Sequence, residues 1–303
     1  MGKSLKMSRD TRNTRDTRHD RETRDTRAFR IAVLQLPGVN CEHETVRALT
    51  AAGLAGEVVR WTRHDLDDYD GFVLPGGFSF QDRVRAGAVA ARQRSVEAVV
   101  AAAHDGRPVL GICNGAQVLV EAGLVPDLGG RGRIEMGLAP NSIPGRRGYY
   151  CAWTYAALTA AGRKSAFGLA GAADEVMPVL VAHGEGRFVT RDPEVEEAMA
   201  SGAVVAFRYV TAEGEPGDRF PANPNGSFAA AAGIVNPRGN VLAFMPHPER
   251  ASWLRQVGWE VAGPWGERRR SAWGDAAELG GPGPGLSLFV SMRLYLERRA
   301  AKS

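Results

Sequence analysis

The sequence predicts an α/β protein with a mostly parallel central sheet covered by helices on both faces. Short apolar runs alternate with helical stretches in the first half of the chain. These runs are continuous, as expected for parallel strands that are buried on both sides. In the second half the apolar runs follow one another with fewer helices between them, which predicts antiparallel additions to the same sheet.

The first half of the chain provides the parallel strands. Glycine or proline follows most of these elements, because neither residue readily continues a helix or an interior strand. Parallel strands require crossover connections, which are usually helices. The expected strands lie at residues 30–36, 57–61, 71–74 and 107–112, and the expected helices at 42–52, 84–103 and 116–122.

The second half extends the sheet and closes the domain. Strands are expected at residues 176–182, 203–210, 231–235 and 241–245. The stretch at about 253–285 is rich in Gly, Pro and Trp and is interpreted as an irregular insertion. An amphipathic helix at residues 286–299 follows it. We therefore expect one domain over residues 29–303, preceded by a tail at residues 1–28.

The basic character of the chain comes from this tail. The chain has 38 Lys and Arg residues against 34 Asp and Glu, and residues 1–30 hold ten of the basic and five of the acidic residues. The remainder carries 28 basic and 29 acidic residues, so the body is nearly neutral and gives no sign of binding nucleic acid. Arg recurs at every third position from Arg9 to Arg27, and such a repeat is expected to be disordered.

Composition excludes several other classes. At 303 residues the chain can bury a large core, and its three cysteines are too few for a disulfide framework. No apolar run is as long as a membrane span, and the amino terminus lacks a secretory signal. No group of His, Cys and acidic residues has metal-site spacing. We therefore expect a cytoplasmic protein that binds neither a membrane nor a metal ion.

The most informative motif is Gly-Ile-Cys-Asn-Gly at residues 111–115, where an apolar strand turns sharply into a helix. In such a turn the central residue has a strained backbone, and the flanking glycines remove side chains that would clash. Cys113 then lies at the helix amino terminus, which favours its thiolate and supplies amide donors. Cys113 is therefore a candidate nucleophile, although an inert cysteine in a Gly-rich turn would have the same local sequence.

A base for this thiol is available in Pro-His-Pro-Glu-Arg at residues 246–250, directly after another apolar strand. A cysteine nucleophile needs a base, and the base needs an orienting group. Residues two apart in an extended segment point the same way, so the Glu249 carboxylate can lie beside the His247 imidazole. Because Cys41 and Cys151 have no adjacent base, we expect them to be packed thiols.

The diglycine after the strand at residues 71–74 is a candidate oxyanion site. It leaves backbone amides unshielded, so the N–H groups of Gly77 and Asn114 could together hold an oxyanion. A tight turn alone would also explain the glycines. The loop lacks the Lys-Ser/Thr of a phosphate-binding loop, so no nucleotide is expected there. Polar turns at residues 183–188 and 221–227 are interpreted as hairpin connections.

Together these motifs resemble the class I (triad) glutamine amidotransferases, which implies a flavodoxin-like three-layer fold. Within that class, the chain is most similar to the glutaminase subunits of phosphoribosylformylglycinamidine synthase. The resemblance covers about residues 30–250 and the final helix. It is carried by residues 37–41, 75–80, 85–88, 111–117, 183–188, 223–227 and 246–250.

The resemblance implies that L-glutamine is hydrolysed and that its ammonia passes to a separate ATP-dependent synthetase subunit, with a small third subunit bridging the two. ATP and Mg²⁺ would bind to the synthetase subunit, and no cofactor is expected in this chain. The matching positions are Cys113 as nucleophile, His247 as base, Glu249 as third triad member, Gly77 and Asn114 as oxyanion donors, and Gln117 and Arg85 near the glutamine pocket.

The sequence departs from the family pattern in places. Phe80-Gln81 stands where the family usually has Tyr-Gly, and residues 141–153 follow the pattern loosely. Two other functions remain open from the residues alone. One is an enzyme on the same scaffold, either a glutaminase serving a different synthetase or a cysteine hydrolase. The other is a non-catalytic flavodoxin-like regulatory module that retains the elbow.

Overall fold

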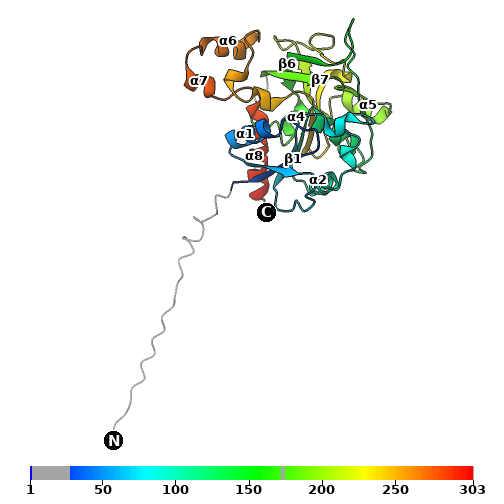
Figure 1. The fold of residues 1–303 in the computed structure, drawn as a ribbon, viewed down its shortest axis with the longest axis vertical. Coiled ribbons are helices and arrows are strands. Elements are labelled where there is room, and N and C mark those ends of the chain that lie inside the picture. Colours follow the sequence, from blue (N-terminus) through cyan, green and yellow to red (C-terminus); the bar gives the residue numbers. More distant parts are fainter. Residues whose placement is uncertain (2–27, 172–174, 303) are drawn as a thin grey trace.

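The computed structural model describes Met1, residues 28–171 and residues 175–302. A central sheet runs through the body, and helices lie on both sides of it (Figure 1). The predicted disordered tail at residues 1–28 lies almost entirely outside the described residues. No described helix is long and apolar enough to cross a membrane.

A nine-stranded sheet forms the centre of the described part, in the order β2-β1-β3-β4-β11-β10-β9-β6-β7. The pairings from β2 to β11 are parallel, and those from β11 to β7 are antiparallel. This confirms the predicted parallel sheet with antiparallel additions. Strands β5 and β8 form a separate pair. The strands are β1 Arg30–Gln35, β2 Ala55–Arg60, β3 Gly71–Leu74, β4 Val109–Ile112, β5 Gly137–Ala139, β6 Tyr150–Leu158, β7 Val176–His183, β8 Arg187–Val189, β9 Val205–Val210, β10 Ala231–Val235 and β11 Val241–Phe244.

Helices form a layer on each face of the sheet. Helices α1 and α8 pack against each other on one side of β1, and α2 lies on the opposite side (Figure 1). Helix α3 packs on β3, β4 and β11. This arrangement confirms the predicted three-layer fold. The helices are α1 Glu42–Ala51, α2 Arg94–His104, α3 Asn114–Glu121, α4 Ala160–Lys164, α5 Pro193–Ala200, α6 Gly263–Ser271, α7 Ala276–Gly280 and α8 Leu286–Ala300.

The structure shortens one predicted helix and contains strands and helices that were not predicted. The Ala-rich helix expected at residues 84–103 begins only at Arg94, because Val84 and Gly87 have φ angles of 73° and 81°. A Cβ at Gly87 would lie 2.6 Å from the backbone of Gln117, so this segment runs closely over α3. Strand β6 was not predicted, although it pairs with both β7 and β9.

The stretch at about 253–285 is more regular than predicted. It contains α6 and α7, which stand to one side of the sheet in Figure 1, and its own small apolar cluster of Leu254, Val257, Val261 and Ala272. Trp259 and Trp273 pack together with ring centroids 5.2 Å apart. The prediction that this stretch is irregular was therefore wrong. Apolar and aromatic residues that are distant in the sequence pack together and order the segment, despite its Gly and Pro content.

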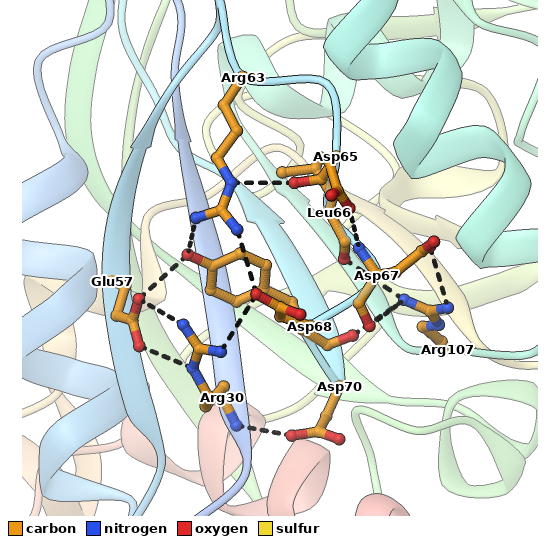
Figure 2. Close-up of polar contacts among 10 residues, drawn as sticks. Arg30, Glu57, Arg63, Asp65, Leu66, Asp67, Asp68, Asp70 and Arg107 are labelled. Atoms are coloured by element: carbon orange, nitrogen blue, oxygen red, sulfur yellow. Dashed lines mark hydrogen bonds and ion pairs between the residues drawn. The ribbon is translucent and has the colours of Figure 1, made fainter.

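Polar side chains near the amino ends of β1 to β4 form a network that Figure 2 shows in close-up. The Arg30 guanidinium donates to both Glu57 carboxylate oxygens, at 2.9 and 3.0 Å. Tyr69 donates to Glu57 at 3.0 Å, and Arg63 binds both Tyr69 and Asp68. We call these five residues the amino-edge network. They join β1 and β2 to the loop that precedes β3.

Candidate active site

Four loops meet at the carboxyl ends of the parallel strands, opposite to the amino-edge network. They follow β1, β3, β4 and β11, which are parallel neighbours, so their carboxyl ends share one edge. The loops carry Cys41, the Gly76-Gly77 pair, Cys113 and His247. The fold thus brings together residues that lie up to about two hundred positions apart in the sequence.

Cys113 occupies a strained turn between β4 and α3. Its φ and ψ angles are 51° and −105°, which non-glycine residues rarely adopt, and its N–H donates to the Phe244 carbonyl at 2.9 Å. A Cβ at Gly111 would lie 2.6 Å from the Gly115 carbonyl oxygen. A Cβ at Gly115 would lie 1.8 Å from the Leu74 carbonyl oxygen. The structure confirms the predicted elbow and the need for both glycines.

The imidazole of His247 is held from two directions. Its backbone N–H donates to the Leu180 carbonyl at 2.8 Å, and its Nδ1 lies 2.6 Å from Glu249 Oε1. An ionised carboxylate only accepts hydrogen bonds, so we assign the proton to Nδ1 and the lone pair to Nε2. His247 is 2% exposed and Glu249 is fully buried. The predicted contact between the two side chains is confirmed. The predicted extended backbone is wrong, because Pro248–Ala251 forms a 3-10 helix that begins directly after His247.

The electrostatics of this pair stabilise the imidazolium that forms when Nε2 takes the Cys113 proton. Burial by itself lowers the pKa of His247, but the Glu249 carboxylate and the Cys113 sulfur outweigh it and raise the pKa well above its usual value. Nε2 is buried and makes no hydrogen bond with the described residues. Contacts between a nucleophile and its base are often long before substrate binds, so Nε2 remains available to the Cys113 thiol.

The two candidate oxyanion donors lie on adjoining loops. Gly77 lies opposite Val39 in an isolated antiparallel bridge. The hydrogen bonds of this bridge run from the Asn40 N–H to the Gly76 carbonyl and from the Phe78 N–H to the Gly38 carbonyl, so the bridge does not use the Gly77 N–H. Asn114 is the first residue of α3, where backbone N–H groups have no intrahelical partner.

The Asn114 side chain fixes these loops to each other. Its Oδ1 accepts from the Ser79 N–H at 2.9 Å, and its Nδ2 donates to Gln117 Oε1 at 2.8 Å. The diglycine loop and the start of α3 are therefore joined directly. Rigid placement of two amide donors is what an oxyanion site requires.

Gln117 and Arg85 lie in different places. Gln117 Nε2 donates to the Glu185 carbonyl at 2.6 Å, so it stands beside the elbow. Arg85 instead pairs with Glu121 at 2.5 Å, near the far end of α3. Eight residues of helix separate Glu121 from Cys113, or about 12 Å along the axis. This placement does not support a pocket role for Arg85.

The carboxyl end of β7 reaches the site, although the residues of the turn that follows it were interpreted as a hairpin connection and pointed to the site only through the family resemblance. The Cys113 sulfur lies 3.6 Å from the Ala182 carbonyl oxygen, which also accepts a 2.8 Å hydrogen bond from the Tyr149 hydroxyl. Tyr149 is about half exposed, and its ring packs against Phe78. The polar Gly-Glu-Gly run directly after an apolar strand was the available signal for this turn.

Of the two remaining cysteines, Cys41 is packed as predicted but has a base beside it, and Cys151 differs from the prediction. Cys41 is buried, but Arg250 donates to its sulfur at 3.1 Å and the His247 imidazole lies beside it. Burial raises the pKa of this thiol, and His247 and Arg250 partly oppose that shift. Cys151 is exposed on β6, so it is not a packed thiol.

Comparisons with known proteins agree with this geometry. The family described as the CobB/CobQ-like glutamine amidotransferase domain matches residues 28–296. Phosphoribosylformylglycinamidine synthase subunit PurQ of Methanothrix thermoacetophila is 42% identical over 277 residues, covering 89% of this chain and 99% of that protein. The subunit of the same name from Pyrococcus furiosus is 42% identical over 223 residues, covering 74% and 89%.

Solved structures extend the similarity to the fold. A chain in the structure of PurLQS from Thermotoga maritima matches with a TM-score of 0.65 and 31% identity, covering 89% of this chain and all of that one. A putative GMP synthase protein from Thermoplasma acidophilum has a TM-score of 0.51 at 17% identity, with 91% of this chain covered and 99% of that one. The second match concerns the fold alone.

Proposed function

The chain belongs to the CobB/CobQ-like glutamine amidotransferase family, and on this basis we propose that it is the glutaminase subunit of a phosphoribosylformylglycinamidine synthase. It is an enzyme of the glutamine amidotransferase type. One observation carries the more specific proposal: 42% identity to a PurQ subunit over 89% of this chain. The residues matched by the family include Cys113, His247 and Glu249.

The first half of the reaction forms a thioester. His247 Nε2 takes the proton of the Cys113 thiol, and the sulfur attacks the side-chain amide carbon of L-glutamine. The developing oxyanion receives hydrogen bonds from the N–H groups of Gly77 and Asn114. As the carbon–nitrogen bond breaks, the imidazolium returns its proton to the leaving nitrogen, and ammonia departs.

The second half releases glutamate. His247 takes a proton from water, which attacks the thioester through the same oxyanion site, and the Cys113 thiol is restored. Glu249 holds the imidazole in the required tautomer and stabilises its positive charge throughout. Each turnover consumes one glutamine and one water and yields glutamate and ammonia.

The ammonia requires an acceptor on another subunit. We infer that the chain assembles with a large ATP-dependent synthetase subunit together with a small bridging subunit, and that the complex converts formylglycinamide ribonucleotide to formylglycinamidine ribonucleotide in the cytoplasm. ATP and Mg²⁺ would bind to the synthetase subunit. The PurQ relatives and the PurLQS structure support this assignment.

Reconstitution tests the proposal. The chain is mixed with the synthetase and small subunits from the same source, and product formation is measured with glutamine as nitrogen donor. We expect the chain to co-purify with the synthetase and to confer glutamine-dependent synthesis. Co-purification with a different synthetase, or no glutamine hydrolysis in the complex, would favour the alternatives of another amidotransferase or a non-catalytic module.

A further inference from the structure

Cys41 places a second thiol beside the triad. The Cys41 sulfur, a ring nitrogen of His247 and a carboxylate oxygen of Glu249 all lie within 4.8 Å of one another. The three residues are 1%, 2% and 0% exposed. They come from the loops after β1 and β11, which is why sequence spacing did not reveal the group.

Gly76 lies close to both the Cys41 sulfur and the Cε1–Nδ1 edge of the His247 ring. A Cβ at Gly76 would lie 3.1 Å from the Cys41 sulfur and 3.4 Å from His247 Nδ1. Nδ1 is also the atom that contacts Glu249 Oε1. We therefore assign Nδ1 as the ring nitrogen that the cluster of thiol, imidazole and carboxylate shares.

Two features of this cluster favour a cation. The second oxygen of Glu249 is buried and has no hydrogen-bond partner among residues 28–171 and 175–302. An unpaired buried anionic oxygen is costly, and a bound cation removes that cost. The Cys41 sulfur, which accepts from the Arg250 guanidinium at 3.1 Å, adds a soft donor atom within reach of the same ion.

The donor set selects the type of cation. One thiolate, one imidazole and one carboxylate suit a borderline-soft divalent ion such as Zn²⁺, which three protein ligands can hold with a fourth position open. Harder ions such as Mg²⁺ and Ca²⁺ prefer sites made only of oxygen ligands. The two anionic ligands contribute a charge of −2, which neutralises the ion, although Arg250 adds one positive charge nearby.

We propose that Cys41, His247 and Glu249 form an inhibitory site for Zn²⁺ or a similar divalent ion. The inhibition rests on the proposed glutaminase function. When the ion binds Nδ1 and the Cys41 sulfur, the thiol proton passes to solvent and the Nδ1 proton is replaced by one on Nε2. Nε2 then has no lone pair for the Cys113 proton, so the base is lost.

Cobalt absorption tests the site without any assay of activity. Co²⁺ is added to the full-length chain and to Cys41→Ser, Cys113→Ser and Cys151→Ser, and Zn²⁺ is used to displace it. We expect a thiolate-to-cobalt charge-transfer band at one ion per chain in the wild type, Cys113→Ser and Cys151→Ser. Since outer-shell changes alone weaken metal affinity by about 10- to 100-fold, loss of the Cys41 ligand should weaken Zn²⁺ binding about 100-fold or more.

A double variant keeps the test decisive if Cys41→Ser does not fold. Cys113→Ser/Cys151→Ser leaves Cys41 as the single thiol of the chain, and it must keep the band. A missing band there, or wild-type Zn²⁺ affinity in a folded Cys41→Ser, would overturn the proposed site.

Inhibition is then measured in the reconstituted complex, with each variant compared with its own rate without Zn²⁺. Zn²⁺ should inhibit glutamine-dependent synthesis in the wild type and in Cys151→Ser. Half-inhibition of Cys41→Ser should need a Zn²⁺ concentration at least about tenfold higher. If the band forms but neither the wild type nor any variant hydrolyses glutamine, the proposed function is contradicted and the metal site is still supported. If the wild type hydrolyses glutamine but forms no band, the metal site is contradicted and the proposed function is still supported.

Discussion

Acidic and basic side chains meet at both ends of the parallel strands, and the two ends hold them differently. At the carboxyl ends, Glu249 is fully buried, and one of its oxygens is without a partner in the described part of the chain. At the amino ends, the Glu57 side chain is 43% exposed, and Arg30 and Tyr69 donate to its oxygens (Figure 2). The carboxyl ends thus leave a buried polar atom without a partner, whereas the carboxylate at the amino ends has hydrogen-bond partners.

This difference separates the proposed catalytic cluster of Cys113, His247 and Glu249 from a structural one. A buried charge without full compensation lowers stability, so its presence indicates that the group is used for something else. An exposed ion pair contributes little, because water competes for each partner. We therefore expect substitutions at the carboxyl edge to change the reaction far more than the stability, and those in the amino-edge network to do the opposite.

The largest contrast between the two edges should come from Glu249→Gln. An amide can orient the imidazole in the wrong tautomer, so we expect the glutamine-dependent kcat of the reconstituted complex to fall by about 10⁴-fold. Ammonium-dependent synthesis should be unchanged, because that step does not use the triad. A fall of less than tenfold would show that Glu249 is not the orienting group.

The same substitution should move the pH profile. Burial lowers the pKa of His247, and the Glu249 carboxylate raises it, so removing the carboxylate leaves the lowering influence. The imidazolium must protonate the leaving amide nitrogen, and the imidazolium is lost as pH rises through its pKa. The alkaline limb of kcat for the residual activity should therefore shift to lower pH. An unchanged limb would mean that another group controls it.

An intermediate effect is expected from Gly76→Ala, because the new Cβ would lie 2.7 Å from His247 Cε1 and push the ring aside. Misplacement of a catalytic group by about 1 Å can reduce kcat by about 10²-fold. The matched control is Gly137→Ala in β5, where a Cβ would meet no atom within 4 Å. Equal kcat values in the two variants would contradict the close packing of the imidazole.

The smallest effect should come from the amino-edge network. Glu57→Gln removes an exposed pair and should lower the free energy of unfolding by about 0.2–1 kcal/mol at neutral pH, with no change in kcat. Arg30 holds the pKa of Glu57 below its usual value, so the stabilisation is present above about pH 4.5 and is lost as pH falls through the lowered pKa. Urea unfolding at two pH values measures it, and a loss of kcat would break the comparison.

The sequence predicted the parts of the site that depend on local geometry. The elbow at Cys113 follows from two glycines and a strand-to-helix change, and the His247–Glu249 contact follows from a spacing of two residues at a strand end. The parallel strands were predictable because their apolar runs are continuous. In each case the deciding residues are neighbours in the sequence, or lie at strand ends that a parallel sheet must bring together.

Contacts between distant segments were not predictable in the same way. The Arg250–Cys41 contact joins residues 209 positions apart. The approach of Ala182 to Cys113 accompanies a bridge between Leu180 of β7 and His247, which are 67 positions apart. Local preference also failed where tertiary packing overrides it. The Ala-rich segment after Val84 is not helical at first, because the chain crosses α3 there with positive φ angles.

The central claim is that Cys113, His247 and Glu249, at the carboxyl ends of the parallel strands, perform the glutaminase step. Its most direct test is Cys113→Ala in the reconstituted complex. Formylglycinamidine ribonucleotide formation is measured with glutamine and, separately, with ammonium as nitrogen donor. We expect glutamine-dependent synthesis to be abolished and ammonium-dependent synthesis to match the wild type. Glutamine-dependent synthesis that persists in this variant would contradict the account.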